Sequence, residues 1–213
     1  MIAIVDYGRG NLGSVEKAFE RLGLEARVTQ DAGVVDAAAA VVLPGDGAFH
    51  DAMVNLGDLG LLPALRRALD GRRPFLGICL GYQLLFSTSE EFGEGRGLDV
   101  IPGVVRRFPP GRKVPHMGWN QVRHGGRLRL FEGIPEDAYF YFVHSYYPVV
   151  AESAAEDGLD VAWCDYGLPF AAAIERGPVC ATQFHPEKSQ RWGLRLLENF
   201  AALVRDSARP ALR

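Results

Sequence analysis

The chain contains 213 residues, and 23 lysines and arginines against 26 aspartates and glutamates give it a formal net charge of −3. This balance excludes a nucleic-acid binder that works by bulk positive charge. Apolar residues make up 48% of the chain, enough for a buried core. No apolar run approaches the roughly 20 residues that cross a bilayer. Asp6 interrupts the first apolar run, which is atypical of a signal peptide, so we expect a cytoplasmic protein without membrane contact.

Short apolar runs alternate with amphipathic stretches through the first half of the chain, and the alternation returns near its end. Runs that are apolar on both faces and separated by helices are typical of parallel strands. We therefore predict an α/β fold with an open, mostly parallel sheet flanked by helices on both faces. The predicted strands cover residues 2–5, 26–29, 41–43, 75–78 and 179–184, and apolar stripes at helical spacing cover 12–22, 61–69 and 194–204.

The alternation of apolar runs and amphipathic stretches stops after Gly93. Residues 93–97 read as a flexible loop, and the short runs that follow, such as 104–105 and 138–143, indicate antiparallel strands added to one edge or face of the sheet. Because the last strand and helix resemble the first half, we predict one domain over residues 1–205 with an insertion. Residues 206–213 are expected to form a frayed tail.

A glycine-rich loop follows the first predicted strand. Residues Gly8 to Gly13 fit the pattern G-x-G-x-x-G, and Asp31 lies near the end of the second strand, as in dinucleotide-binding folds. Asp6 and Tyr7 separate the strand from the first glycine, however, and a carboxylate there would face the pyrophosphate. The alternative is a strand-to-helix loop in which Asn11 caps the helix.

Cys79 lies between Gly77 and Gly81, at the junction of a buried strand and a helix. Small neighbours permit the strained turn of a nucleophile elbow, and a helix N-terminus favours the thiolate. The odd count of three cysteines argues against a disulfide framework. Cys164 and Cys180 lack flanking glycines, so we expect them to pack as small apolar side chains.

A general base for this thiol is predicted at His185, in the segment His185-Pro186-Glu187. Proline keeps the preceding residue extended, and side chains two positions apart on an extended chain face the same way. Glu187 can then hold one imidazole nitrogen and leave the other to take a proton from Cys79. If strand 179–184 is parallel to strand 75–78, both groups meet at one sheet edge.

An acyl-transfer site also needs donors for an oxyanion. The N–H of Leu80, directly after the nucleophile, is one candidate, and the glycine turn at residues 44–49 offers another.

Elbow, glycine turn and His-x-Glu, in this order, resemble the class I (triad) glutamine amidotransferases, and the resemblance covers essentially the whole chain. Within that class the chain is most similar to the family of glutaminase subunits of imidazole glycerol phosphate synthases. The segments that carry this similarity are residues 6–11, 115–120, 141–146 and 183–189. The resemblance implies hydrolysis of glutamine through a cysteine thioester, without a cofactor, and transfer of ammonia to a (β/α)8-barrel synthase subunit in histidine biosynthesis. It also implies low activity until that partner is bound.

The resemblance assigns roles to individual residues. It implies a triad of Cys79, His185 and Glu187, oxyanion donors at Leu80 and Gly47, substrate contacts at Gln83, Glu91 and Ser145, and a partner interface at Asn11, Trp119, Tyr141 and Lys188. The interface residues have plain alternatives as strand core, solvated charge or helix cap. Asp46 departs from the apolar residue common in the oxyanion turn. A carboxylate there would repel an oxyanion, so we expect the backbone to carry that function.

Three other functions remain open from the sequence. The chain could serve a different amidotransferase pathway, act as a cysteine hydrolase on the same fold, or bind a nucleotide at Gly8 to Gly13. His50, His116 and His124 show no ligand spacing, so we predict no metal site.

Overall fold

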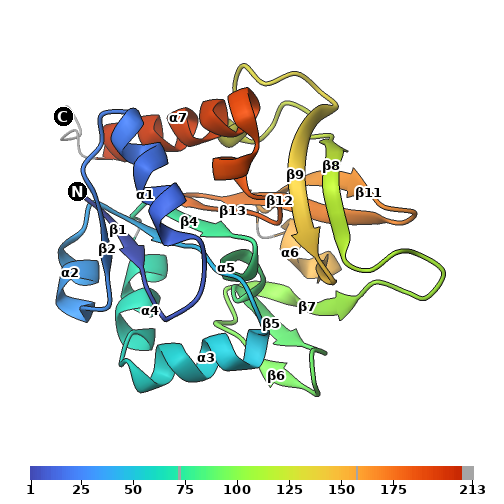
Figure 1. Ribbon diagram of the computed structural model, residues 1–213, viewed down its shortest axis with the longest axis horizontal. Coiled ribbons are helices and arrows are strands. Elements are labelled where there is room, and N and C mark those ends of the chain that lie inside the picture. The colour runs from blue at the N-terminus through green and yellow to red at the C-terminus, as the bar shows by residue number, and fades with distance from the viewer. Residues whose placement is uncertain (72, 157, 208–213) are drawn as a thin grey trace.

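A computed structural model describes residues 1–71, 73–156 and 158–207. Within these residues the centre of the molecule is a seven-stranded sheet in the order β11-β12-β13-β4-β3-β1-β2 (Figure 1). Its strands are β1 (Ile2–Val5), β2 (Ala26–Thr29), β3 (Ala40–Leu43), β4 (Phe75–Ile78), β11 (Asp160–Asp165), β12 (Pro169–Arg176) and β13 (Val179–Thr182). The run from β13 to β2 is parallel, and β12 and β11 add an antiparallel edge. The predicted fold class is confirmed.

Helices cover both faces of this sheet (Figure 1). Alternation along β1 shows why: Ile2 and Ile4 join one core with α1 (Leu12–Arg21) and α7 (Gln190–Ser207), while Ala3 and Val5 join the core of the opposite face. That opposite face carries α2 (Ala32–Ala37), α3 (Phe49–Asp58) and α4 (Leu62–Asp70). None of the described helices is both long and apolar enough to span a membrane.

The end of α7 differs from the predicted boundary. The helix continues through Ser207, so the boundary at residue 206 falls inside its last turn. Residues 208–213, the rest of the predicted tail, lie outside the described residues.

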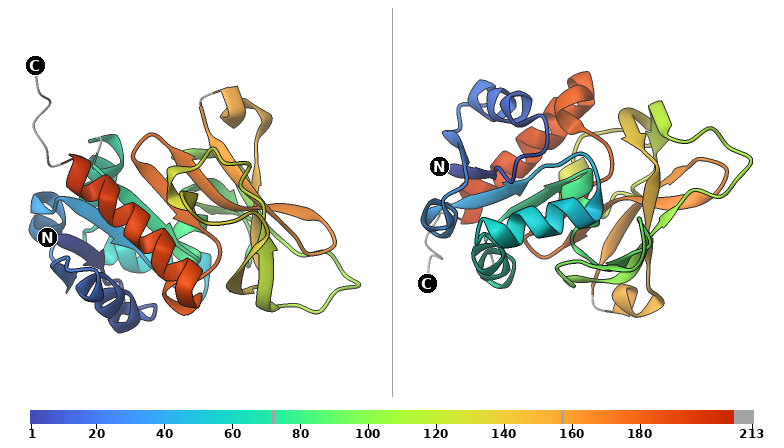
Figure 2. Two further views of the ribbon diagram at one scale, coloured as in Figure 1. Left: turned by 90° about the horizontal axis from the view of Figure 1, so that it is seen from above. Right: turned by 60° about the horizontal axis from the view of Figure 1, so that its bottom comes forward.

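Residues 80–156 form a separate, mostly antiparallel part beside the central sheet (Figure 2). It consists of a four-stranded sheet in the order β10-β7-β5-β6 and a two-stranded ribbon of β8 and β9. The elements are α5 (Leu80–Gln83), β5 (Phe86–Ser89), β6 (Gly95–Arg96), β7 (Ile101–Arg107), β8 (His116–Val122), β9 (Ala138–His144), β10 (Tyr146–Val150) and α6 (Glu152–Glu156), with one 3-10 turn, η1, at Arg129–Phe131. The loop predicted at 93–97 therefore contains a strand, β6, which pairs with β5. The parallel pairing of β5 with β7 differs from the prediction of antiparallel strands.

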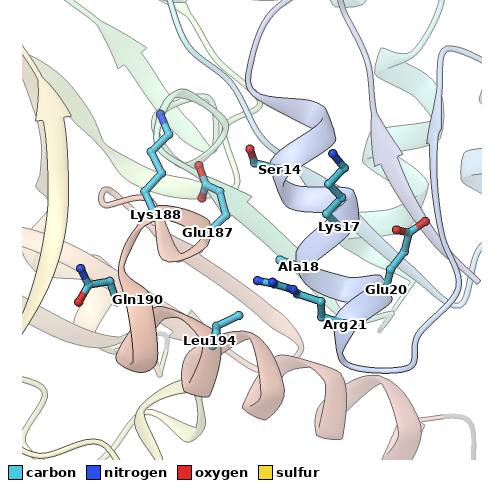
Figure 3. Close-up of a pocket in the computed structure, with 9 residues that line it drawn as sticks. All are labelled: Ser14, Lys17, Ala18, Glu20, Arg21, Glu187, Lys188, Gln190 and Leu194. Carbon is cyan, nitrogen blue, oxygen red and sulfur yellow. The ribbon is translucent and has the colours of Figure 1, made fainter.

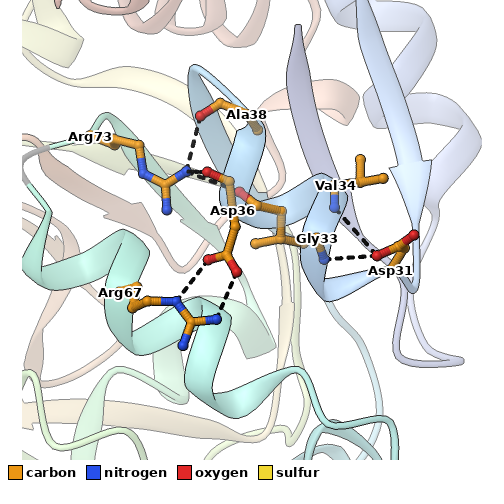
Figure 4. A network of polar contacts seen from close by, with 8 residues as sticks. Asp31, Gly33, Val34, Asp36, Ala38, Arg67 and Arg73 are labelled. Carbon is orange, nitrogen blue, oxygen red and sulfur yellow. Dashed lines mark hydrogen bonds and ion pairs between the residues drawn. The ribbon is translucent and has the colours of Figure 1, made fainter.

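Asp31, the acid that a dinucleotide site would need, has a structural role instead. Its carboxylate accepts the N–H groups of Gly33 and Val34 at 2.7 and 3.4 Å and caps α2 (Figure 4). Two hydrogen bonds from the Arg67 guanidinium to the Asp36 carboxylate, at 2.9 and 2.7 Å, then tie α2 to α4. Arg67 thereby holds the pKa of the Asp36 carboxyl below its usual value.

Candidate active site

Cys79 is the turning point between β4 and α5. It adopts φ 55° and ψ −106°, a conformation that L-residues rarely take, and its side chain is buried. A β-carbon on Gly81 would lie 1.7 Å from the Leu43 carbonyl oxygen, so only glycine permits this close approach of α5 to β3. The backbone at Cys79 therefore makes the strained strand-to-helix turn that the sequence predicts. Cys164 and Cys180 are buried as expected, and burial raises the pKa of both thiols.

His185 follows β13, and because β13 is parallel to β4 it reaches the same sheet edge as Cys79. Its backbone is extended, and its Nδ1 lies 2.8 Å from Oε1 of Glu187. Glu187 reaches it by a different route than predicted, because residues Pro186–Lys188 form a 3-10 turn, η2, rather than a continuing strand. The turn still aims the carboxylate at the imidazole, so Cys79, His185 and Glu187 lie in the order of a catalytic triad.

The charge on His185 is set by its two partners. Burial alone would lower the pKa of the imidazole, but the Cys79 charge, a side-chain hydrogen bond with Cys79 and the Glu187 carboxylate together raise it to about 10. The Glu187 side chain is only 1% exposed, so its interaction with His185 is little screened by water. The arrangement favours an imidazolium beside the Cys79 sulfur, and a charged imidazole can give a proton to a leaving group.

A cavity of about 410 Å³ opens above Cys79. It brings together residues from the two halves of the fold: the elbow, the turn after β3, the end of β9 and the segment after β13. Of the predicted catalytic, oxyanion and substrate residues, the cavity is lined by Cys79, His185, Leu80, Gly47, Gln83, Glu91 and Ser145. Glu187 supports His185 from the other side. The cavity is therefore a candidate active site.

The two predicted oxyanion donors differ in their present state. Gly47 has φ +90° and lines the cavity, whereas the Leu80 N–H donates to the Gly45 carbonyl at 3.4 Å. Asp46 lies between Gly45 and Gly47 in the sequence, and its Oδ1 accepts the N–H of Gly10 at 3.1 Å. This hydrogen bond ties the turn after β3 to the loop after β1. The turn formed by residues 44–48, called the oxyanion turn below, thus occupies the Leu80 N–H, one of the two predicted oxyanion donors.

The side-chain amide of Gln83 joins α5 to the start of β10 and to the segment after β13. Gln83 Nε2 donates to the Tyr146 carbonyl and to Oε1 of Gln183, both at 3.0 Å. Gln183 Nε2 in turn lies 3.7 Å from Cys79 Sγ. Sequence reasoning did not single out Gln183, although it belongs to the segment that carried the family resemblance.

Glu91 and Ser145 close the other side of the cavity. Glu91 Oε2 accepts the N–H of Phe49, the first residue of α3, at 2.7 Å. Burial raises the pKa of the Glu91 carboxyl, and this hydrogen bond from Phe49 opposes the shift. The Ser145 carbonyl accepts the N–H of Phe108 at 3.1 Å, which fixes the chain between β9 and β10. A carboxylate and a set of fixed backbone groups therefore face the cavity.

A second histidine site, unforeseen from the sequence, supports this chain segment. His116 and His144 are register partners on β8 and β9, and their Nδ1 and Nε2 atoms lie 3.0 Å apart. His144 Nδ1 must donate to the Tyr146 carbonyl at 2.8 Å, because a carbonyl only accepts. Its Nε2 then accepts from His116 Nδ1, and His116 Nε2 accepts from Asn120 Nδ2 at 3.2 Å. The relay requires both imidazoles to be neutral.

Electrostatics keep this pair neutral. Burial lowers the pKa of His116 to about 4. Burial, and the positive charge that His116 and His185 carry when protonated, lower the pKa of His144 to about 3, and the hydrogen bond to the Tyr146 carbonyl opposes the shift. No sequence signal identified the pair, since the two histidines are 28 positions apart and meet only through the strand register.

The predicted partner residues lie along one series of contacting elements, α1, η2, β9 and β8. Asn11 is exposed at the start of α1 and makes no side-chain capping bond, so the predicted cap is wrong. Trp119 is 45% exposed and its ring meets that of Tyr141 at 6.1 Å. Lys188 is exposed on η2 and lines both the active-site cavity and a neighbouring one.

That neighbouring cavity, of about 730 Å³, lies between α1 and the start of α7 (Figure 3). Lys17 and Arg21 on α1 face Glu187 and Lys188 on η2 across it. The cavity therefore adjoins the far side of the triad. Among the described residues no group of three histidine, cysteine or acidic side chains could hold a metal ion.

Comparison with known proteins shows the family of the chain. A family profile described as glutamine amidotransferase class-I matches residues 3–203. The chain therefore belongs to the class I glutamine amidotransferase family. Within it the chain is 56% identical to the imidazole glycerol phosphate synthase subunit HisH of Moorella thermoacetica, over 96% of this chain and 95% of that one. It is 51% identical to the same subunit of Desulfitobacterium hafniense, over 98% and 97%. These identities place the chain in the HisH subunit family.

A solved glutamine amidotransferase structure shows the same fold, with a TM-score of 0.71 at 23% identity, over 96% of this chain and 99% of that one.

Proposed function

We propose that this chain is the glutaminase subunit of an imidazole glycerol phosphate synthase. It hydrolyses glutamine to glutamate and ammonia and passes the ammonia to a (β/α)8-barrel synthase subunit in histidine biosynthesis, which is a cytoplasmic pathway in this proposal. The observation that carries the assignment is the single cavity of about 410 Å³ in which the elbow thiol, its imidazole and the predicted substrate contacts converge.

In the proposed reaction the Cys79 thiolate attacks the side-chain amide carbon of glutamine. The N–H groups of Leu80 and Gly47 stabilise the oxyanion, and the His185 imidazolium gives its proton to the departing ammonia. Neutral His185 then takes a proton from a water molecule that hydrolyses the glutamyl thioester, and glutamate leaves. Glu187 holds the imidazole throughout.

Substrate glutamine carries an ammonium and a carboxylate beside its reactive amide. We assign the ammonium to the Glu91 carboxylate, which lines the cavity. Gln83 and the backbone of Ser145 would orient the rest of the molecule. Their own hydrogen bonds to the neighbouring chain support this role because they fix both groups before glutamine binds.

The resting hydrogen bond between the oxyanion turn and Leu80 explains why we expect the chain alone to hydrolyse glutamine slowly. Leu80 N–H can stabilise an oxyanion only after the Gly45 carbonyl has moved away from it. We propose that docking of the barrel subunit on Asn11, Trp119, Tyr141 and Lys188 favours this movement. The bond from Gly10 to Asp46 supports the idea, since it joins the turn to the loop that carries Asn11.

Nucleotide binding at Gly8 to Gly13 is disfavoured by the same loop. The Gly8 N–H donates to Asp6 Oδ1 at 2.8 Å and the Gly10 N–H donates to Asp46, so carboxylates occupy amides that phosphate would need. Asp31 is the cap of α2. No observation favours a second function over the glutaminase.

The test is a glutaminase assay of the purified chain, alone and with the barrel subunit and a ligand of that subunit. We expect stimulation of roughly tenfold or more, the size of a typical coupling between two sites. Glutamine hydrolysis without any stimulation would contradict the synthase assignment, and absence of hydrolysis in both samples would contradict the glutaminase itself.

A further inference from the structure

Tyr7 carries a buried hydroxyl group without a partner. It follows β1 directly, its side chain is 1% exposed, and among the described residues only its hydroxyl and Oε2 of Glu187 are buried side-chain atoms that lack a hydrogen bond. Tyr82 shows the usual arrangement, because its buried hydroxyl donates to the Ala171 carbonyl at 3.3 Å. Buried polar groups are nearly always paired, so the Tyr7 hydroxyl calls for a reason.

The hydroxyl lies against the oxyanion turn. A β-carbon built on Gly45 would be 1.8 Å from the Tyr7 hydroxyl oxygen and 3.1 Å from Leu80 Cβ. The phenol therefore fills the space that any other side chain at position 45 would take, next to the elbow. The carbonyl of this same Gly45 accepts the Leu80 N–H. The unpaired Tyr7 hydroxyl thus lies beside Gly45, whose carbonyl must move away from Leu80 before the Leu80 N–H can bind an oxyanion.

We propose that Tyr7 is a positioning residue for glutamine hydrolysis: when the Gly45 carbonyl leaves Leu80, it accepts a hydrogen bond from the Tyr7 hydroxyl. This inference rests on the proposed function, in which Leu80 N–H must bind the oxyanion. At rest the Leu80 amide is paired with Gly45 and the phenol is unpaired. In the active state Leu80 binds the oxyanion and the phenol pairs with Gly45. Tyr7 therefore stabilises the active turn without stabilising the resting one.

Two further observations fit a donor held in place. Burial raises the pKa of the Tyr7 phenol far above its usual range, the charges of Cys79 and Asp46 add to the shift, and Arg9 opposes it. The hydroxyl therefore keeps its proton and cannot act as a base. The Tyr7 backbone is also fixed, because Asn55 Nδ2 on α3 donates to its carbonyl at 3.0 Å.

The experiment is the substitution Tyr7→Phe, assayed in the complex with the barrel subunit. We expect kcat for glutamine to fall roughly ten- to a hundredfold, the loss that follows when a buried carbonyl loses its donor, while KM stays within about twofold. The melting temperature should be unchanged or higher, since the resting phenol has no bond to lose. Tyr82→Phe is the matched control: it should lower the melting temperature and leave kcat nearly unchanged.

Alkylation of Cys79 by iodoacetamide separates this role from a direct effect on the thiol. Alkylation is a displacement that forms no oxyanion, so its rate in Tyr7→Phe should equal that of the unmodified chain. A normal kcat in Tyr7→Phe would overturn the proposal, and so would parallel losses of alkylation and hydrolysis. Glutamine hydrolysis that survives in Cys79→Ala would instead refute the proposed function, whatever Tyr7→Phe shows.

Discussion

Two histidine sites border the same cavity and carry opposite shifts in pKa. His185, His116 and His144 are all at most 6% exposed, yet the pKa of His185 is raised to about 10 while those of His116 and His144 are lowered to about 4 and about 3. Burial acts in the same direction on all three. The difference is the partner: Cys79 and the Glu187 carboxylate raise the pKa of His185, whereas the pair bonds only to neutral groups.

The two histidine sites therefore have different roles beside the cavity. A charged imidazole can deliver a proton, and the proposed reaction needs one for the leaving ammonia. A neutral pair can serve as a directional relay of hydrogen bonds that holds the Ser145–Tyr146 backbone in place. Changing the groups that bond to the histidines of either site should therefore shift the pKa of those histidines towards that of the other site.

The largest expected effect comes from Glu187→Gln, which removes the carboxylate from His185. The amide would donate to Nδ1 and favour the wrong tautomer, so kcat should fall about a thousandfold or more, as for other triads that lose their acid. The pKa of His185 should fall towards that of the neutral pair, which an NMR titration of the imidazole measures. Glu90→Gln, at an exposed carboxylate paired with Arg106, is the control and should leave both values unchanged. An unchanged His185 pKa in Glu187→Gln would refute the comparison.

A smaller effect is expected from His144→Leu, which breaks the neutral relay. The Tyr146 carbonyl would lose one of its two side-chain donors, so we expect KM for glutamine to rise roughly three- to tenfold with a lesser change in kcat. His124→Gln is the matched control, because His124 is equally buried and bonds to the Ile134 carbonyl away from the cavity. Both variants should lose stability, and only His144→Leu should raise KM. Equal KM values for the two would show that the relay has no part in substrate binding.

The smallest effect concerns stability in mild acid. Unfolded histidine takes up a proton near pH 6.5, whereas folded His116 and His144 resist it down to about 4 and about 3. The unfolded state then binds more protons, so the free energy of unfolding should fall as the pH drops below about 6.5. His185 acts in the opposite sense: its contribution is complete below the unfolded pKa and is lost only as the pH rises towards 10.

Urea unfolding at pH 7 and pH 5 measures this difference. The unmodified chain should be less stable at pH 5, and His144→Leu should lose less stability between the two values. An identical loss in both would assign the acid sensitivity to other groups.

Much of the central sheet was predictable because its physics is local. Four-residue strands buried on both faces, such as β1 and β4, are separated by helices with apolar stripes, and that pattern is readable along the chain. The antiparallel part was predicted only in outline. Its strands pair across long separations in sequence, β10 with β7 and β9 with β8, in a register that no local signal encodes.

The same division applies to the site. Cys79 and its glycines, and His185 with Glu187, are close in sequence to the features that position them, so local rules were enough to propose them. The His116–His144 relay depends on strand register, and the unpaired Tyr7 hydroxyl depends on its contact with Gly45. The Leu80–Gly45 bond depends on the resting conformation of a turn, which composition does not encode. Contacts between distant segments were therefore the part that required the structure.

The most direct test of the account is the variant Cys79→Ala in complex with the barrel subunit, supplied in turn with glutamine and with an ammonium salt. The account predicts that glutamine-dependent synthesis is abolished while ammonia-dependent synthesis by the barrel continues at its normal rate. Synthesis that still responds to glutamine would contradict the assignment of Cys79 as the nucleophile, and loss of both activities would contradict the separation of the two subunits' tasks.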